Sequence, residues 1–161
     1  MTTAPSSTPD PTTEAIAEAV TQGRDGDVAS ARSKLLSLWA TMGVTGDPLH
    51  RCSLAHYLAD LYEDPAEALT WDIRALDAAD AVTAQDIAGF YPSLHLNLAD
   101  NYRRLGSFAA ATEHIEAARE HTPALLQDAY GDLIRRAVRE VAEAIADRDR
   151  APRPSAPGSP A

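Results

Sequence analysis

The stretch Ser93–Phe108, with the sequence SLHLNLADNYRRLGSF, decides the fold class. It carries an apolar stripe of Leu94, Leu98, Tyr102 and Leu105, and a polar stripe of Asn97, Asp100 and Arg104. Steps of three and four residues place each stripe on one side of a helix. Gly106 favours the end of this helix, and Ser107 is a typical residue at the start of the next one. The stretch therefore predicts two helices joined by a tight turn.

The same signals divide the rest of the chain into helices. Asp47-Pro48, Asp64-Pro65 and Thr122-Pro123 each place a capping side chain before a proline. Proline is tolerated at the first helical position because its missing N–H would be unpaired there in any case. We expect helices at 12–22, 27–42, 48–62, 65–79, 92–105, 108–121 and 123–146, while 80–91 either extends a neighbouring helix or forms a short one. No segment alternates as a strand does, so the predicted fold class is all-α, built from antiparallel helix pairs.

Composition sets the limits of the folded part and of its partners. The 161 residues suit one domain, expected at 12–147, between disordered Pro-rich tails at 1–11 and 148–161. The net charge of −10 resides in the helical body. Such a body repels a phosphate backbone, so we expect no nucleic acid partner and favour a basic protein segment or a cationic small molecule. Cys52 is the only cysteine, so an internal disulfide and a Cys-rich metal site are excluded.

The sequence has no recognisable targeting or membrane segment. The start, MTTAPSSTPDPTT, lacks the basic and apolar regions of a signal peptide. No apolar run approaches the roughly 20 residues that span a bilayer. We therefore expect a cytoplasmic protein that does not bind membranes.

The segment from Leu96 to Pro123, LNLADNYRRLGSFAAATEHIEAAREHTP, closely resembles a tetratricopeptide repeat. The matching positions are Leu98, Ala99, Tyr102, Gly106, Phe108, Ala111, Ile115, Ala118 and Pro123. A looser copy, SLAHYLADLYEDPAEALTWDIRAL, begins at Ser53, and a weaker unit precedes it. Leu54 and Leu98 are 44 positions apart, more than the usual repeat of about 34. This spacing is similar to the long repeats of kinesin light chains, and the whole chain resembles small actinobacterial repeat proteins of undefined role.

The resemblance implies a short superhelix of stacked helix pairs. In this family a C-terminal helix closes the stack, and the expected helix 123–146 is amphipathic through Leu126, Ile134, Val138, Val141 and Ile145. One face of each first helix in the family lines a concave groove that holds peptides. The corresponding positions here are Cys52, Ser53, His56 and either Ala59 or Asp60 in the middle repeat, and Ser93, Leu96, Asn97, Asp100, Arg103 and Arg104 in the last one. From these we predict a partner-binding site of His56, Asp60, Asn97, Asp100, Arg103 and Arg104.

Cys52, His56 and Asp60 share a helix face, which leaves three interpretations open. A closed zinc site would need a further ligand from another helix. A Cys–His nucleophile would need a low thiol pKa, which an acidic body opposes. We favour the third interpretation, a groove face with a partly packed cysteine, and we predict no catalytic residue, metal or cofactor.

The polar stripe of the opening stretch also has two interpretations. Asp100 and Arg104 could form a simple solvated ion pair. Alternatively, Asn97 could bind the backbone of a ligand, although the middle repeat lacks the lysines of family members that clamp a carboxylate. We expect His95 to be half-buried between helices, and we expect Trp39, Trp71, Phe90 and Tyr91 to belong to the core.

The leading hypothesis is a non-catalytic adaptor or regulatory module that binds another protein in its groove. No phosphate loop, nucleophile elbow or HExxH motif is present to indicate a common enzyme class. The alternative is a small-molecule binder, or an enzyme of a specialised pathway, that uses Cys52 and His56 in the same cavity. A homodimer formed through an apolar face of the last helix is a further possibility.

Overall fold

A computed structural model describes residues 10–153. Within these residues the chain forms seven α-helices and two 3₁₀ helices, with no strand. The α-helices are α1 (Pro11–Arg24), α2 (Val28–Met42), α3 (Pro48–Ala59), α4 (Pro65–Asp80), α5 (Tyr91–Leu105), α6 (Phe108–His121) and α7 (Ala129–Ala146). The 3₁₀ helices are η1 (Ala88–Phe90) and η2 (Thr122–Ala124). The predicted all-α fold class is confirmed.

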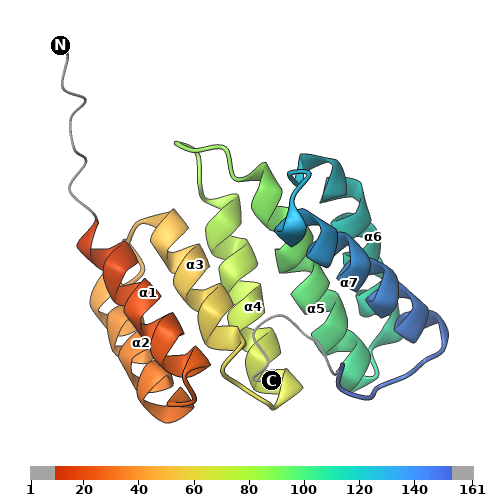
Figure 1. Ribbon diagram of the computed structural model, residues 1–161, viewed down its shortest axis with the longest axis horizontal. Helices are drawn as coiled ribbons and strands as arrows, with labels where there is room; N and C mark the ends of the chain where they lie inside the picture. The colour runs from red at the N-terminus through yellow and green to blue at the C-terminus, as the bar shows by residue number, and fades with distance from the viewer. Residues whose placement is uncertain (1–9, 154–161) are drawn as a thin grey trace.

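The helices stack as antiparallel pairs. The pairs α1–α2, α3–α4 and α5–α6 pack together, and α7 closes the far end against α5 and α6 (Figure 1). Their packing is consistent with a helical repeat-like fold. No described helix is long and apolar enough to cross a bilayer.

Aspartate side chains begin most of the helices, as the sequence indicates. Asp47 and Asp64 accept hydrogen bonds from the first backbone amides of α3 and α4, and each precedes a proline. Such caps satisfy amides that have no partner inside the helix. Gly106 ends α5 with a φ of 85°, a left-handed conformation that glycine adopts without strain. The predicted turn between α5 and α6 is confirmed.

The last helix begins later than predicted. Thr122-Pro123 opens only the short η2, after which Leu125 is extended and buried in the core. Asp128 caps α7 instead, by accepting from the amide of Gly131 at 2.7 Å. Leu126, which we expected on the apolar face of this helix, lies outside it and is 73% exposed. The start at residue 123 was therefore wrong, because a buried extended residue interrupts the helix.

Two other boundaries differ from the prediction, and the structure decides between the two possibilities for residues 80–91. The helix expected at 48–62 ends at Ala59, since the chain turns there before Asp64. Residues 80–91 hold the short helix η1, the second of the two possibilities. Residues 148–153 were assigned to a tail by composition. Asp149–Ala151 bond to α5 and Arg153 bonds to Glu140 of α7, so the domain extends at least to Arg153. Asp10 and Pro11, also assigned to a tail, cap and begin α1. The rest of the two predicted tails, residues 1–9 and 154–161, lies outside the described residues.

The apolar core forms two clusters that meet at α5. Leu94 belongs to the cluster of α1 to α4, and Leu96 belongs to the cluster of α6 and α7. In the first cluster Trp71 packs edge-on against Trp39, with ring centroids 5.2 Å apart. Because α5 contributes to both clusters, its polar stripe is held in a fixed position between them.

Candidate groove site

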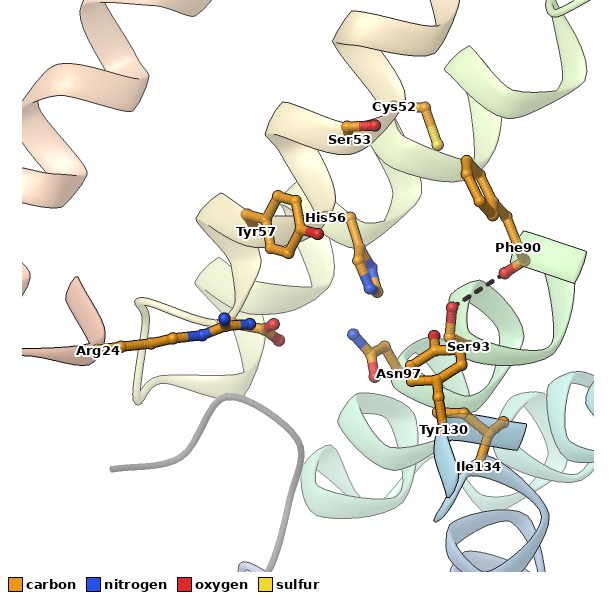
Figure 2. A pocket seen from close by; sticks show the side chains of 11 residues that line it. Arg24, Cys52, Ser53, His56, Tyr57, Phe90, Ser93, Asn97, Tyr130 and Ile134 are labelled. Atoms are coloured by element: carbon orange, nitrogen blue, oxygen red, sulfur yellow. Dashed lines mark hydrogen bonds between the residues drawn. The ribbon is translucent and has the colours of Figure 1, made fainter. Parts of the chain in front are cut away.

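A concave groove opens between α3 and α5, with a cavity of about 200 Å³. All its walls come from the odd-numbered helices and the residues next to them (Figure 2). Its lining residues are Arg24, Cys52, Ser53, His56, Tyr57, Asp60, Phe90, Ser93, Asn97, Tyr130 and Ile134. His56 and Asn97 point toward one another across it (Figure 2). The structure thus brings together His56, Asp60 and Asn97, three of the predicted site residues.

A second, smaller cavity of about 100 Å³ adjoins the first. The two cavities share Asp60 and Asn97. The smaller one is strongly polar, with Asp72, Asp100, Asn101, Arg104 and Arg153 among its other lining residues. Together the cavities form one groove with an aromatic part and an acidic part.

Asp72 on α4 is a buried carboxylate behind the groove, with an exposed fraction of 2%. Asn101 donates to one of its oxygens at 2.7 Å, and Asn97 approaches the other at 3.5 Å. The Nδ1 of His56 lies 3.8 Å from the same carboxylate, which is an ion-pair distance rather than a hydrogen bond. Burial raises the pKa of Asp72 above its ordinary value, although His56 and the two asparagines oppose the rise. The sequence prediction missed Asp72, because it sits in the second helix of its pair.

Asp60, the residue that caps the end of α3, is half-buried, whereas Asp72 is fully buried. The pKa of its carboxyl is raised from 3.8 to about 7, chiefly by burial and further by the charge of Asp72, against the opposing charges of His56 and Arg24. No hydrogen-bond donor among residues 10–153 contacts the carboxylate. Burial alone would lower the pKa of His56, but Asp72 and Asp60 outweigh burial and raise it. The groove is therefore a site where negative charge is costly in the absence of a further cation.

Three large aromatic side chains are exposed at the groove. Tyr57 is 37% exposed, Phe90 44% and Tyr130 52%. The prediction that Phe90 belongs to the core was wrong, because η1 turns its ring toward the cavity. Tyr130 was missed, since only the late start of α7 brings it beside α5. Exposed tyrosines and phenylalanines of this kind are common anchors at protein interfaces.

The remaining predicted site residues form a different set of contacts. Arg103 is fully buried, so its side chain is not presented to a partner. It pairs with Asp100 at 2.7 Å, which replaces the Asp100–Arg104 pair considered from the sequence. Arg104 donates instead to the backbone carbonyl of Glu63 at 3.1 Å, and it lines the smaller cavity. The sequence pattern places Asp100, Arg103 and Arg104 on one side of α5. It does not show that the C-terminal segment covers Arg103.

Cys52 is a packed thiol. It is 1% exposed, and burial raises its pKa to about 11, with a smaller contribution from the charge of Asp80. A thiolate nucleophile needs the opposite shift. Among residues 10–153 no group of three His, Cys, Asp or Glu side chains is arranged to hold a metal ion.

His95 lies between α5 and α6, as expected, in a stack of aromatic rings. Its Nδ1 lies 3.0 Å from the Nδ1 of His114, and its ring also stacks with those of Tyr91 and His121. The pKa of His95 is lowered from 6.5 to about 4, chiefly by burial and in smaller part by the charges of His114 and His121. Burial also lowers the pKa of His114, so His95 and His114 favour their neutral forms, away from the groove.

No protein-family model, curated protein or solved structure matches this chain. The resemblance to tetratricopeptide repeats thus stays a prediction from the residue pattern.

Proposed function

We propose that this protein is a non-catalytic interaction module of tetratricopeptide-like type that binds an extended, basic segment of another protein in its groove. The observation that carries the proposal is the Asp60 carboxylate, which is half-buried, lies beside the buried Asp72 and receives no hydrogen bond within residues 10–153. An isolated buried charge costs free energy unless a cation or donor satisfies it. A lysine or arginine of a partner would supply that cation.

The rest of the groove fits a peptide ligand. The exposed rings of Tyr57, Phe90 and Tyr130 offer apolar contact area with little conformational entropy to lose. Asn97 carries an amide that can both donate to and accept from a peptide backbone. The net charge of −10 would steer a basic segment toward the protein.

The alternative, a small-molecule binder or enzyme, has weaker support. The buried Cys52 thiol, with a pKa raised to about 11, is a poor nucleophile. The cavity of about 200 Å³ lies below the roughly 300–1,000 Å³ typical of small-molecule sites. A peptide needs only a few side-chain pockets along an open groove.

A peptide-display selection on the full chain tests the proposal. We expect the selected peptides to be rich in arginine or lysine and to lose about tenfold or more in affinity with Asp60→Asn and with Tyr130→Ala. Asp77→Asn and Leu126→Ala are matched controls, since both residues are exposed away from the groove. Peptides that bind all four variants as tightly as the unmodified protein would refute the groove assignment.

A further inference from the structure

The chain reverses direction after α7 and returns along the end of α5 (Figure 1). Arg148 adopts a φ of 53°, and its guanidinium lies 4.5 Å from the centre of the Phe108 ring. The amide of Asp149 donates to the carbonyl of Ala144 at 2.9 Å. This reversal directs Asp149–Arg153 back toward the groove.

The helix α5 holds the returning segment by its backbone. The buried guanidinium of Arg103 donates to the carbonyls of Asp149 and Ala151, the latter at 2.9 Å. The Nε of Arg150 donates to the carbonyl of Arg104 at 3.0 Å. Hydrogen bonds to main-chain carbonyls give a groove affinity for a peptide whatever the peptide's side chains are. The segment is thus bound in the manner of a ligand.

Arg153 brings the segment into the acidic part of the groove. Its side chain is only 10% exposed and donates to Glu140 at 2.8 Å. Its buried Nε has no partner among the described residues. The side chain lines the smaller cavity together with Asp60 and Asp72. A basic side chain of the protein itself therefore lines the acidic cavity that the proposed function assigns to a basic side chain of the partner, although it bonds to Glu140 and leaves Asp60 without an ion pair in the part of the chain that the structure describes.

We infer that Asp149–Arg153 is an internal ligand, which occupies the acidic end of the groove and competes there with the extended, arginine-bearing segment of the partner. The inference rests on the proposed function and adds a regulatory step to it, because the partner must displace the segment. A short tether gives a bound segment an effective concentration in the millimolar range. A free peptide of the same sequence should therefore bind poorly to the intact protein.

The test uses a labelled synthetic peptide of residues 148–157, RDRAPRPSAP, and full-length protein. Arg153→Glu places a negative charge beside the acidic cavity, which should repel the returning segment. The double variant Arg150→Ala/Arg153→Glu also removes the hydrogen bond to the Arg104 carbonyl. We expect fluorescence anisotropy to show that the peptide binds both variants at least about tenfold more tightly than the unmodified protein. Arg139→Glu, an equal charge change at an exposed position of α7, should leave peptide affinity unchanged.

Hydrogen exchange provides an independent readout. In the variants, the amide of Ala151 should lose protection, while the amides of α1 to α7 keep theirs. Equal peptide affinity for the unmodified protein and the double variant would overturn the inference.

The two proposals can fail separately. If display-selected peptides depend on Tyr130 yet bind the unmodified protein and the double variant equally, partner binding stands and occupation by the protein's own segment is refuted. Alternatively, the 148–157 peptide could bind only the Arg153→Glu and Arg150→Ala/Arg153→Glu variants, while peptide display yields no ligand that depends on Tyr130. In that case the internal ligand stands and the proposed function fails.

Discussion

Replacing Asp60 by asparagine should stabilise the protein at neutral and alkaline pH. Burial raises the pKa of this carboxyl from 3.8 to about 7, so the ionised form is unfavourable in the folded state. Each tenfold change in proton affinity corresponds to about 1.4 kcal/mol, which places an upper limit of about 4 kcal/mol on the cost of ionisation. Partial exposure of Asp60 to solvent screens its charge and reduces this cost. We expect a gain of about 1–2 kcal/mol at about pH 8.

The sign of the pH dependence follows from the direction of the shift. Between about pH 4 and pH 7 the folded protein holds the Asp60 proton more tightly than the unfolded chain does. In that window the stability of the unmodified protein falls as pH rises, whereas an asparagine contributes no such slope. The advantage of Asp60→Asn should therefore grow between about pH 4 and pH 7 and then level off.

Urea unfolding followed by helical circular dichroism measures this difference. Asp77→Asn, at an exposed position of α4, is the matched control and should change the free energy of unfolding by less than about 0.5 kcal/mol at every pH. A loss of stability by Asp60→Asn at about pH 8 would refute the reasoning, because it would show that the Asp60 carboxylate is satisfied within the protein. A stabilising variant that no longer binds peptides would instead identify Asp60 as a residue that trades stability for function.

Two further perturbations test the fold around the groove. Gly131→Ala should destabilise the protein by about 2 kcal/mol or more, because the added Cβ would lie 2.1 Å from the carbonyl oxygen of Leu126. In the control, Gly89→Ala, the nearest atom to the added Cβ is the carbonyl oxygen of Ala124 at 3.5 Å, so the melting temperature should change little. The unmodified protein should lose stability between about pH 7 and pH 5, because the lowered pKa values of His95 and His114 make their protonation oppose folding below the ordinary value of 6.5. His95→Phe should reduce this loss by about 1 kcal/mol. Equal slopes of stability against pH in the two proteins would show that the neutral stack is not what couples stability to pH.

Much of the helical framework could be predicted from local signals. Asp47, Asp64 and Gly106 act within a few residues of their own position, so their roles in starting or ending a helix are visible in the sequence. Thr122-Pro123 shows the limit of this reasoning. The pair carries the same local signal, but the burial of Leu125 keeps the next residues extended and delays α7 to Ala129. A long-range contact overrides the cap there.

The groove was predictable only in part, and for the same reason. His56, Asp60 and Asn97 lie on the groove side of first helices, where helical periodicity and the repeat pattern both place them. Arg103 shares that pattern, yet it is buried by a C-terminal segment that the composition had assigned to a tail. Arg24, Asp72 and Tyr130 come from other helices and reach the groove only through packing.

The sequence by itself determined the all-α class, most helix boundaries and one polar side of α3 and α5, because these depend on spacing and capping along the chain. Only the tertiary structure decided which side chains meet in the groove and which carboxylates are buried there. It also decided that Asp149–Arg153 returns to the acidic end of the groove. Burial and the coupling between charges depend on contacts between segments that are far apart in the sequence, and so does the path of the returning chain. No local sequence pattern can therefore predict them.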